Sequence, residues 1–195
     1  GGLIDATFAG LNNLNFVILD GNAYNSSVPA VMGTLQNLQF LYIAEAFITG
    51  DLSYMEGMPV IREHWIDTNP GLGGTIPSFV GLLSTLISYS VTESTLVGTL
   101  PTELGNLNDM EFMWFYSNSL TGQIPSEYGV LLSLDTLRLE GNGFTGSMPD
   151  EVCALTNIFV GSLDQLGADC DNNPNFSCAC CDCCGVAECA AVFGQ

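Results

Sequence analysis

Prolines recur at a fixed interval along most of this 195-residue chain. They occupy positions 29, 77, 101, 125 and 149, so that one interval is 48 residues and three are 24, and Ser53 stands at the skipped step. An aliphatic residue precedes each position, and a glycine lies three residues before Ser53 and before each later proline of the series. Such a period is typical of stacked-repeat proteins, in which a unit buries its apolar face only against its neighbours.

Alignment on the prolines divides the chain into six units, 11–34, 35–57, 58–82, 83–106, 107–130 and 131–154. Residues 1–10 supply the end of a preceding copy, and residues 155–195 hold a degenerate last unit and a cysteine-rich cap. In the clearest unit, Leu137 and Leu139 alternate with Arg138, which predicts a short strand with both leucines inward. Stacked copies of that strand would form a parallel sheet.

The clearest unit spells L-x-x-L-x-x-L-x-L-x-x-N-x-F-x-G-x-M-P, and the repeat resembles the plant-type leucine-rich repeat. The resemblance implies an α/β-type solenoid: a right-handed horseshoe with a concave parallel sheet, short convex strands and 3-10 turns, and a disulfide-rich C-terminal cap. It also implies an asparagine ladder after the strands, formed by Asn22, Asn69, Asn118 and Asn142. The cysteine-rich tail is similar to the end of secreted or receptor-like leucine-rich-repeat proteins of diatoms and related algae.

The third unit fits the repeat only with one extra residue. A strict spacing would place Trp65 and Asp67 in the core, and burial of a lone carboxylate is costly. An extra residue within 69–74 instead directs His64 and Ile66 inward. We therefore predict that His64 replaces a core leucine and is a hydrogen-bonded core histidine rather than a catalytic group.

The two ends of the stack are expected to differ. The N-terminal end begins inside a copy and should be open, with further repeats or a partner ahead of it; the residues in its columns are Gly2, Ile4, Asp5, Phe8 and Gly10. The other end should be closed by a last degenerate unit that contains Leu155, Ile158 and Leu163.

The cysteines cluster toward the C-terminus: Cys153, Cys170, Cys178, Cys180, Cys181, Cys183, Cys184 and Cys189. An even number suits a disulfide framework made in an oxidising compartment. The thiols lie too close together for an ordinary zinc motif, so we predict no metal site, and nothing in the sequence implies a cofactor. We predict the pair Cys153–Cys170, and expect neighbouring cysteines to have different partners.

The charge of the chain excludes several classes of function. It has 21 acidic residues and two basic ones, Arg62 and Arg138, and a net charge of −19. Binding to nucleic acid or to anionic lipid requires basic residues that displace counterions. The longest uncharged stretch, 68–92, is interrupted by prolines and glycines, so we predict no membrane insertion. With the cysteines, the sequons at Asn25 and Asn175 indicate a secreted or cell-surface glycoprotein.

The sequence also offers little for catalysis. It has one histidine, which is expected to point inward, and no lysine, and neither arginine lies beside a glycine-rich phosphate loop. The usual nucleophile and base pairs cannot be assembled from these residues. The concave acids Glu45, Glu63, Asp67 and Glu93 should lie along an open sheet rather than across a substrate from one another. We predict that the protein is not an enzyme.

Three columns of residues around the inward pair should face solvent on the concave side. They are Phe16, Phe40, Glu63, Ser88, Phe112 and Thr136; Ile18, Tyr42, Trp65, Ser90, Trp114 and Arg138; and Asp20, Ala44, Asp67, Thr92, Tyr116 and Glu140. The small polar residues of the fourth unit should separate the apolar members into two groups. An exposed apolar patch rimmed by acids is typical of an interaction site.

We therefore expect an extracellular module that binds a neutral or basic protein, peptide or glycan. The predicted contacts are Phe16, Phe40, Tyr42, Trp65, Phe112, Trp114, Tyr116 and Arg138, with Glu63, Asp67 and Glu140 attracting a cationic partner. The alternative for the aromatic residues is that they only stiffen the sheet. Other hypotheses are a structural or adhesive role and ice binding by convex threonines, namely Thr49, Thr75, Thr99, Thr121 and Thr145.

Overall fold

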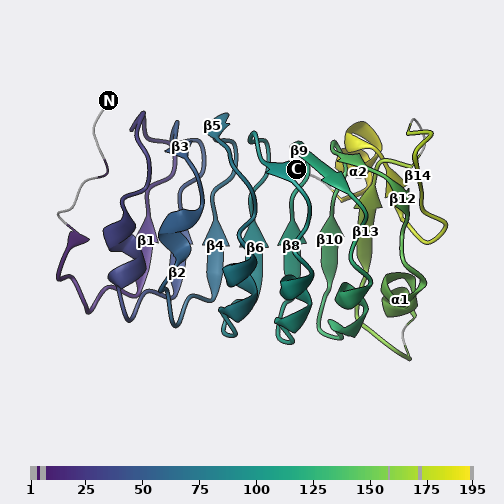
Figure 1. The fold of residues 1–195 in the computed structure, drawn as a ribbon, viewed down its shortest axis with the longest axis horizontal. Helices are drawn as coiled ribbons and strands as arrows, with labels where there is room; N and C mark the ends of the chain where they lie inside the picture. Colours follow the sequence, from purple (N-terminus) through teal and green to yellow (C-terminus); the bar gives the residue numbers. More distant parts are fainter. Residues whose placement is uncertain (1–3, 5–7, 158, 171–172, 194–195) are drawn as a thin grey trace.

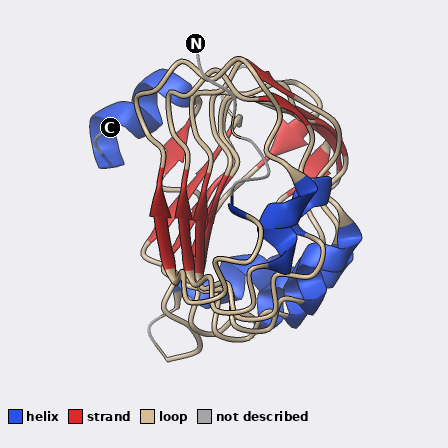
Figure 2. Ribbon diagram, turned by 90° about the vertical axis from the view of Figure 1, so that its left-hand side faces the viewer, coloured by secondary structure: helices blue, strands red, loops and turns tan. Residues whose placement is uncertain are grey.

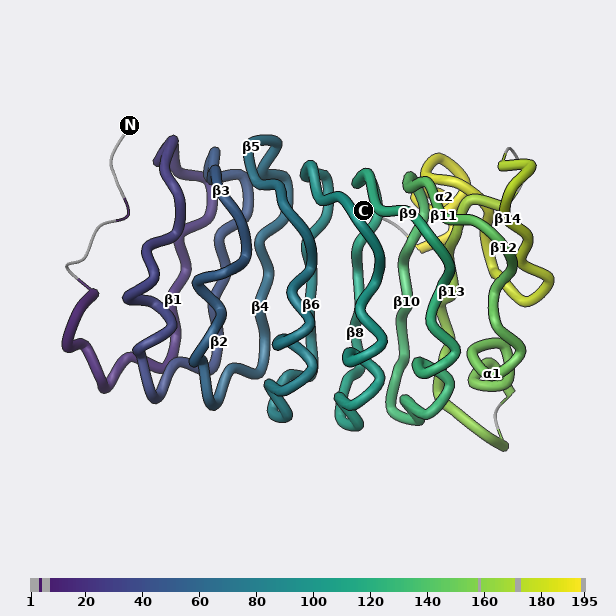
Figure 3. Tube along the Cα trace, viewed as in Figure 1, coloured from purple at the N-terminus to yellow at the C-terminus, as the bar shows by residue number. Residues whose placement is uncertain are grey.

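A computed structural model describes residues 4, 8–157, 159–170 and 173–193. Its main sheet is parallel throughout, and the strands follow one another in chain order (Figure 1). The strands of this concave sheet are β1 (Phe16–Ile18), β2 (Phe40–Tyr42), β4 (Glu63–Trp65), β6 (Ser88–Ser90), β8 (Phe112–Trp114), β10 (Thr136–Arg138), β13 (Gln165–Ala168) and β15 (Cys183–Cys184). The fold is a leucine-rich-repeat solenoid in which each unit makes one turn of the coil (Figure 3).

Short helices line the side of the solenoid opposite the sheet (Figure 2). They are η2 (Ala30–Thr34), η3 (Ser53–Met55), η4 (Ser78–Leu82), η5 (Thr102–Asn106), η6 (Ser126–Val130), α1 (Asp150–Cys153) and η7 (Ala154–Thr156). Each proline of the 24-residue series directly precedes one of these helices, with extended backbone. Proline suits the start of a helix because its missing N–H would have no partner there. This placement explains the proline column.

A second set of short strands follows the concave strands from the second unit onward. These strands are β3 (Thr49–Gly50), β5 (Gly71–Leu72), β7 (Val97–Gly98), β9 (Ser119–Gly122), β11 (Gly143–Phe144), β12 (Gly146–Ser147) and β14 (Phe176–Ser177). Here the threonine methyl groups pack on glycines of the next unit: a Cβ on Gly71 would lie 2.9 Å from Thr49 Cγ2, and one on Gly122 2.8 Å from Thr99 Cγ2. Repeat packing therefore accounts for these threonine and glycine columns.

The register predicted for the third unit is confirmed. His64 is fully buried and is paired in the sheet with Leu41 on one side and Tyr89 on the other. The Tyr54 hydroxyl lies 2.6 Å from His64 Nε2. Burial lowers the pKa of His64 to about 3, so the ring is neutral at physiological pH.

The asparagine ladder is present for three of the four residues expected to form it. The buried Asn69 accepts bonds from the backbone N–H groups of Ala46 and Ile48 and donates to the carbonyl oxygen of Ile43 (2.7 Å) in the preceding unit. Asn118 and Asn142 make corresponding bonds. Asn22 is exposed and donates only within its own turn.

The residue before each ladder position has a positive φ, because the chain turns sharply as it leaves the strand. This left-handed column consists of Gly21, Glu45, Thr68, Glu93, Ser117 and Gly141, with φ from 48° to 73°. Glycine adopts this conformation freely, whereas another residue pays roughly 1–2 kcal/mol for it. The first and last units therefore have glycine at this turn, which adopts the conformation without strain. The four inner units have other residues there, and each of these carries a cost in backbone strain.

The C-terminal cap contains four disulfides, Cys153–Cys180, Cys170–Cys184, Cys178–Cys181 and Cys183–Cys189. The predicted pair Cys153–Cys170 is wrong. Cys153 ends α1 on the helical side of the solenoid, whereas Cys170 follows β13 of the concave sheet, and each pairs with the tail instead. Adjacent cysteines do have different partners, as expected. The Cys183–Cys189 disulfide ties helix α2 (Val186–Phe193) to β15.

The two end units match the sequence pattern where they are described. At the N-terminal end Ile4 is buried and Phe8 half-buried, while Gly2 and Asp5 lie outside the described residues. At the other end Leu155 and Leu163 are buried as expected, and Ile158 lies outside the described residues.

Candidate functional site

Six aromatic side chains project from β1, β2, β4 and β8, and we call them the aromatic strip: Phe16, Phe40, Tyr42, Trp65, Phe112 and Trp114. Their ring centroids are 5.4 Å apart for Phe16 and Phe40, 5.3 Å for Phe16 and Tyr42, 4.8 Å for Tyr42 and Trp65, 6.3 Å for Trp65 and Trp114, and 6.1 Å for Phe112 and Trp114. These separations are typical of interacting rings. The strip is therefore continuous from the first strand to the fifth.

The expected separation of the aromatic residues into two groups is wrong. Trp65 and Trp114 belong to strands that flank β6, yet their rings are stacked, with an angle of 28° between their planes. The small side chains of Ser88 and Ser90 on β6 leave room for this contact and are buried. Trp65 Nε1 also donates a hydrogen bond to Ser88 Oγ (2.7 Å). The serines thus bridge the strip.

Exposure along the strip is greatest at the first strand. Phe16 is 43% exposed and its neighbour Ile18 is 55% exposed, whereas the other rings of the strip are half-buried. Trp65 has Tyr42 stacked on one side, 26° from parallel, and Trp114 on the other. Trp65 is therefore enclosed by aromatic neighbours, and the most exposed aromatic and aliphatic side chains are Phe16 and Ile18 of β1.

Hydrogen bonds fix the acidic residues beside the strip. The Tyr42 hydroxyl donates to Glu63 Oε2 (2.6 Å), and Asp67 Oδ1 accepts bonds from Ser90 Oγ (2.6 Å) and from the N–H and hydroxyl of Thr92 (both 2.9 Å). Burial, and then the hydrogen bond to Glu63, raise the pKa of Tyr42. Burial also raises the pKa of Asp67, although its hydrogen bonds oppose the rise. Both carboxyl groups are therefore held in position, and each uses one oxygen within the sheet.

Arg138 and Glu140 do not face solvent, contrary to the prediction. They are 4% and 0% exposed, and Arg138 donates from Nε (2.9 Å) and Nη2 (2.5 Å) to Glu140 Oε1. The guanidinium lies 4.3 Å from the centroid of the Tyr116 ring and 5.5 Å from that of Phe193 on α2. Burial raises the pKa of Glu140, although Arg138 opposes the rise. The cap therefore withdraws this pair from any ligand on the sheet.

Several small polar residues on or beside β6 and β10 are buried, although the sequence predicts that they face solvent. They are Ser88, Ser90, Thr92 and Thr136. Tyr116 is half-buried beside Arg138. Of the predicted contacts, the structure brings together the aromatic strip and leaves Tyr116, Arg138 and Glu140 at its covered end.

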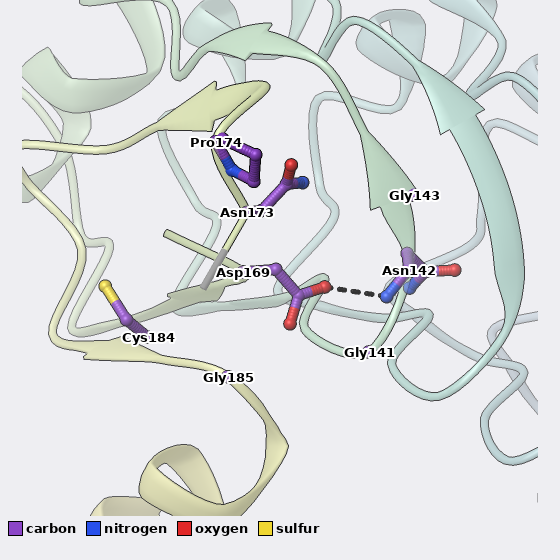
Figure 4. Close-up of a pocket in the computed structure, with 8 residues that line it drawn as sticks. All are labelled: Gly141, Asn142, Gly143, Asp169, Asn173, Pro174, Cys184 and Gly185. Carbon is purple, nitrogen blue, oxygen red and sulfur yellow. Dashed lines mark hydrogen bonds between the residues drawn. The ribbon is translucent and has the colours of Figure 1, made fainter. Parts of the chain in front are cut away.

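A polar hollow of about 370 Å³ lies in the cap beyond that end (Figure 4). It is lined by Gly141, Asn142, Gly143, Asp169, Asn173, Pro174, Cys184 and Gly185. Asp169 Oδ2 accepts a bond from the backbone N–H of Asn142 (2.7 Å), so this carboxylate closes the turn that ends the ladder. Within the described residues no group of three His, Cys, Asp or Glu side chains could hold a metal ion.

The sequons and the convex threonines are accessible. Asn25 and Asn175 are both exposed. All five threonines of the predicted ice-binding columns are exposed as well, but Gly73 and Val97 interrupt the column that contains Thr49 and Thr121. In the described part of the chain, no helix is both long and apolar enough to span a bilayer.

Comparisons with known proteins agree with the repeat and the fold. Residues 133–155 match the family model described as Leucine Rich Repeat. A search of curated proteins finds no match. Among solved structures, a TDR receptor is 33% identical with a TM-score of 0.77, and covers 80% of this chain. The leucine-rich-repeat ectodomain of GASSHO1/SCHENGEN3 from Arabidopsis thaliana, in complex with CASPARIAN STRIP INTEGRITY FACTOR 2, is 27% identical with a TM-score of 0.74, and covers 86%.

The chain spans only part of these receptors, 27% of the first and 19% of the second. A plant ice-binding protein also shares the fold, with 20% identity and a TM-score of 0.55 over 83% of this chain and 42% of that one. None of these comparisons supports the algal affinity suggested by the cysteine-rich tail. One of the first two structures is a receptor and the other is the leucine-rich-repeat ectodomain of a receptor kinase, and the chain shares their fold.

Proposed function

We propose that this protein is an extracellular or cell-surface leucine-rich-repeat module that binds a protein or peptide segment through the aromatic strip. The observation that carries the proposal is the continuity of the strip across β6, since five ring contacts join residues from four strands into one surface. Aromatic residues at a sheet surface provide large contact areas at low entropic cost and are common anchors of interfaces.

The ring geometry favours a peptide over a glycan. A sugar that stacks on an aromatic residue needs a free ring face, and both faces of Trp65 have aromatic neighbours. The exposed Phe16 and Ile18, together with the hydrogen-bonded carboxylate of Glu63, instead suit an extended chain with apolar side chains. The GASSHO1/SCHENGEN3 ectodomain, which has the same fold, was solved in complex with CASPARIAN STRIP INTEGRITY FACTOR 2, and this adds support to the proposal.

The ligand is expected to be neutral or basic. The net charge of the protein is −19, Glu63 lies beside the strip, and the buried Arg138 offers no exposed positive charge there. Four disulfides and two accessible sequons support an extracellular location, with glycosylation at Asn25 and Asn175.

The test uses a favourable property of the chain: its two tryptophans, Trp65 and Trp114, both lie in the strip. A peptide selected from a random displayed library against the native protein should change the intrinsic tryptophan fluorescence on titration. The double variant Trp65→Ala/Trp114→Ala has no tryptophan, so its affinity is measured by the fluorescence anisotropy of a dye-labelled copy of the peptide, with the native protein measured in the same way. It should lose about tenfold or more of the affinity, the effect expected of interface anchors.

The control is Phe159→Ala, since Phe159 is 90% exposed on a loop outside the concave sheet. It should leave the affinity unchanged. Because the indoles are stacked and half-buried, their removal should also lower the free energy of unfolding, so folding of the double variant is checked by circular dichroism. A folded double variant with native affinity would show that the aromatic residues only stiffen the sheet.

Ice binding is less well supported. Four of the five threonines already pack their methyl groups against glycines of the next unit, namely Thr49, Thr75, Thr99 and Thr121. The likeness to the plant ice-binding protein is one of fold alone. Inhibition of ice recrystallisation that disappears when Thr121 and Thr145 are replaced by bulky residues would revive this hypothesis. Self-association at low concentration, measured by analytical ultracentrifugation, would instead favour the adhesive role.

A further inference from the structure

A second hollow, of about 410 Å³, opens at the rim of the sheet beyond the carboxyl ends of β1, β2 and β4. It is lined by Gly21, Glu45, Phe47, Thr68 and Pro70, and we call it the rim hollow. None of these residues belongs to the aromatic strip. Since they follow the strands that carry Phe16, Tyr42 and Trp65, an extended ligand on the strip can reach the hollow with one side chain.

The aromatic wall of the rim hollow is unusually exposed. Phe47 is 56% exposed and has a φ of +54°, and Glu45, two residues earlier, has a φ of +52°. Glu45 shares this conformation with the rest of the left-handed column, whereas Phe47 lies outside the column and adds a second strained residue to the turn. Hydrogen bonds from the N–H groups of Ala46 and Ile48 to Asn69 Oδ1 hold the turn in place. The turn therefore presents Phe47 to solvent in a fixed conformation.

The acidic wall is not neutralised by the protein itself. Glu45 is exposed, and among the described residues its carboxylate has no hydrogen-bond or ion-pair partner. The chain has two arginines: Arg138 is buried against Glu140, and Arg62 precedes β4, at the end of the strand opposite the hollow. A carboxylate next to an exposed aromatic ring and a proline is thus left without a cation.

We propose that the rim hollow binds an arginine or lysine side chain of the peptide on the aromatic strip. The aliphatic stem lies against Pro70, and the cation lies over the Phe47 ring and pairs with Glu45. Cations are attracted to the faces of aromatic rings, and arginine is the commoner partner. This proposal rests on the proposed function, because it assumes that the ligand is a peptide whose main chain lies on the aromatic strip. The binding of a side chain in the rim hollow can nevertheless be tested separately.

The probe is N-acetyl-arginine methylamide, titrated into the full chain and followed by NMR chemical shifts, with the citrulline analogue as its uncharged match. The arginine probe should shift the signals of Phe47 and Glu45, and the citrulline probe should not. Glu45→Gln should weaken the arginine probe about fivefold, as should Phe47→Leu, which keeps an apolar side chain but removes the ring. Added salt should weaken binding in the native protein.

Glu93→Gln is the matched control. Glu93 occupies the same left-handed column, with a φ of +48°, and is exposed, but does not line the hollow. This variant should bind the arginine probe like the native protein. Equal binding of the arginine and citrulline probes would overturn the proposal, because the hollow would then be a simple apolar contact. Equal losses in Glu45→Gln and Glu93→Gln would also overturn it, since binding would then depend on overall charge.

The two proposals fail separately. Binding in the rim hollow should leave the tryptophan fluorescence unchanged, whereas binding on the strip should change it. If Glu45→Gln does not weaken the probe while a selected peptide still loses affinity in Trp65→Ala/Trp114→Ala, only the subsite is wrong. If the probe behaves as expected while the tryptophan variant binds the peptide normally, only the function proposed for the strip is wrong.

Discussion

The two ends of the concave sheet are built on the same repeat but have opposite surfaces. At the N-terminal end the outward positions of β1 expose Phe16 and Ile18. Toward the C-terminal end the equivalent positions of β10 hold Thr136 and Arg138, and both are buried. The Arg138 guanidinium lies against the rings of Tyr116 and of Phe193 in the cap. The repeat therefore predicts that the side chains of an outward column point away from the core. Whether such a side chain is exposed to solvent also depends on the residues and the cap that lie around it.

The carboxylates at the two ends differ in the same way, in their burial and in their partners. Glu63, near the open end, is half-buried and accepts one bond from Tyr42, whereas Glu140 is fully buried and depends on Arg138. A carboxylate in water is tolerated without a partner, but a buried one is not. Three predictions test how far this contrast extends, in order of decreasing effect.

The largest effect is expected from Glu140→Ala. It leaves the Arg138 guanidinium buried without its carboxylate, which should lower the free energy of unfolding by about 3–5 kcal/mol. Glu63→Ala at the open end should cost about 1 kcal/mol or less, because the Tyr42 hydroxyl can turn to water. Urea denaturation followed by circular dichroism measures both. Equal losses of unfolding free energy in the two variants would mean that the cap does not shield Arg138 and Glu140 from water.

A double variant separates lost charge pairing from lost packing. Arg138→Met/Glu140→Leu replaces both charges with apolar groups of similar size and should be far more stable than Glu140→Ala, since no charge is left buried without a partner. A double variant as unstable as the single one would show that packing of the carboxylate beneath α2, rather than its charge, is what matters.

A smaller effect is expected from acid. The folded-state pKa of His64 is about 3, below its ordinary 6.5, so between these values the unfolded state binds more protons. His64 therefore stabilises the fold fully above pH 6.5, and that stability is lost as the pH falls toward 3, by up to about 1.4 kcal/mol per pH unit. Glu140, whose pKa is raised above 4.5, acts in the opposite direction: acidification through its folded pKa stabilises the fold.

The pH effect can be assigned by comparing unfolding curves at pH 7 and pH 5, where the native protein should lose about 2 kcal/mol from His64. In His64→Leu/Tyr54→Phe this loss should disappear, and the second substitution avoids leaving the Tyr54 hydroxyl without its partner. An unchanged loss in the double variant would assign the acid sensitivity to other groups.

The smallest effect concerns the left-handed column, in which the end units have glycine and the inner ones do not. Thr68→Gly should raise the free energy of unfolding by about 0.5–1 kcal/mol, because a β-branched residue with a φ of +54° is relieved of strain. Thr68→Ala keeps the unfavourable backbone and should not stabilise. Calorimetric midpoints distinguish the two variants, and a gain with alanine would point to the side chain instead.

Sequence alone predicts the features that repeat. The positions of Ile66 and His64 follow from the cost of burying Asp67, and the ladder bonds of Asn69 follow from the family pattern. These features depend on contacts between equivalent positions in adjacent units, and the repeat length identifies which residues are equivalent.

Features that depend on the ends or on unequal neighbours could not be predicted in this way. The partners of Cys153 and Cys170 lie in a tail with no repeat, so spacing carries no information about them. The burial of Glu140 requires knowledge of where α2 lies. The contact between Trp65 and Trp114 could have been anticipated, since a serine at the outward position of an intervening strand leaves space for rings on both sides.

The burial of Arg138 has a practical consequence for proteolysis. Trypsin cleaves after lysine or arginine, and this chain offers it two sites, Arg62 and Arg138. Arg62 is exposed, although its carbonyl oxygen accepts bonds from the N–H groups of Ile87 and Ser88, so cleavage there requires local opening of the sheet edge. Cleavage at Arg138 requires β10 to separate from β8 and β13, between which it is paired. A tryptic fragment that ends at residue 138 therefore measures how often the C-terminal part of the sheet opens around β10.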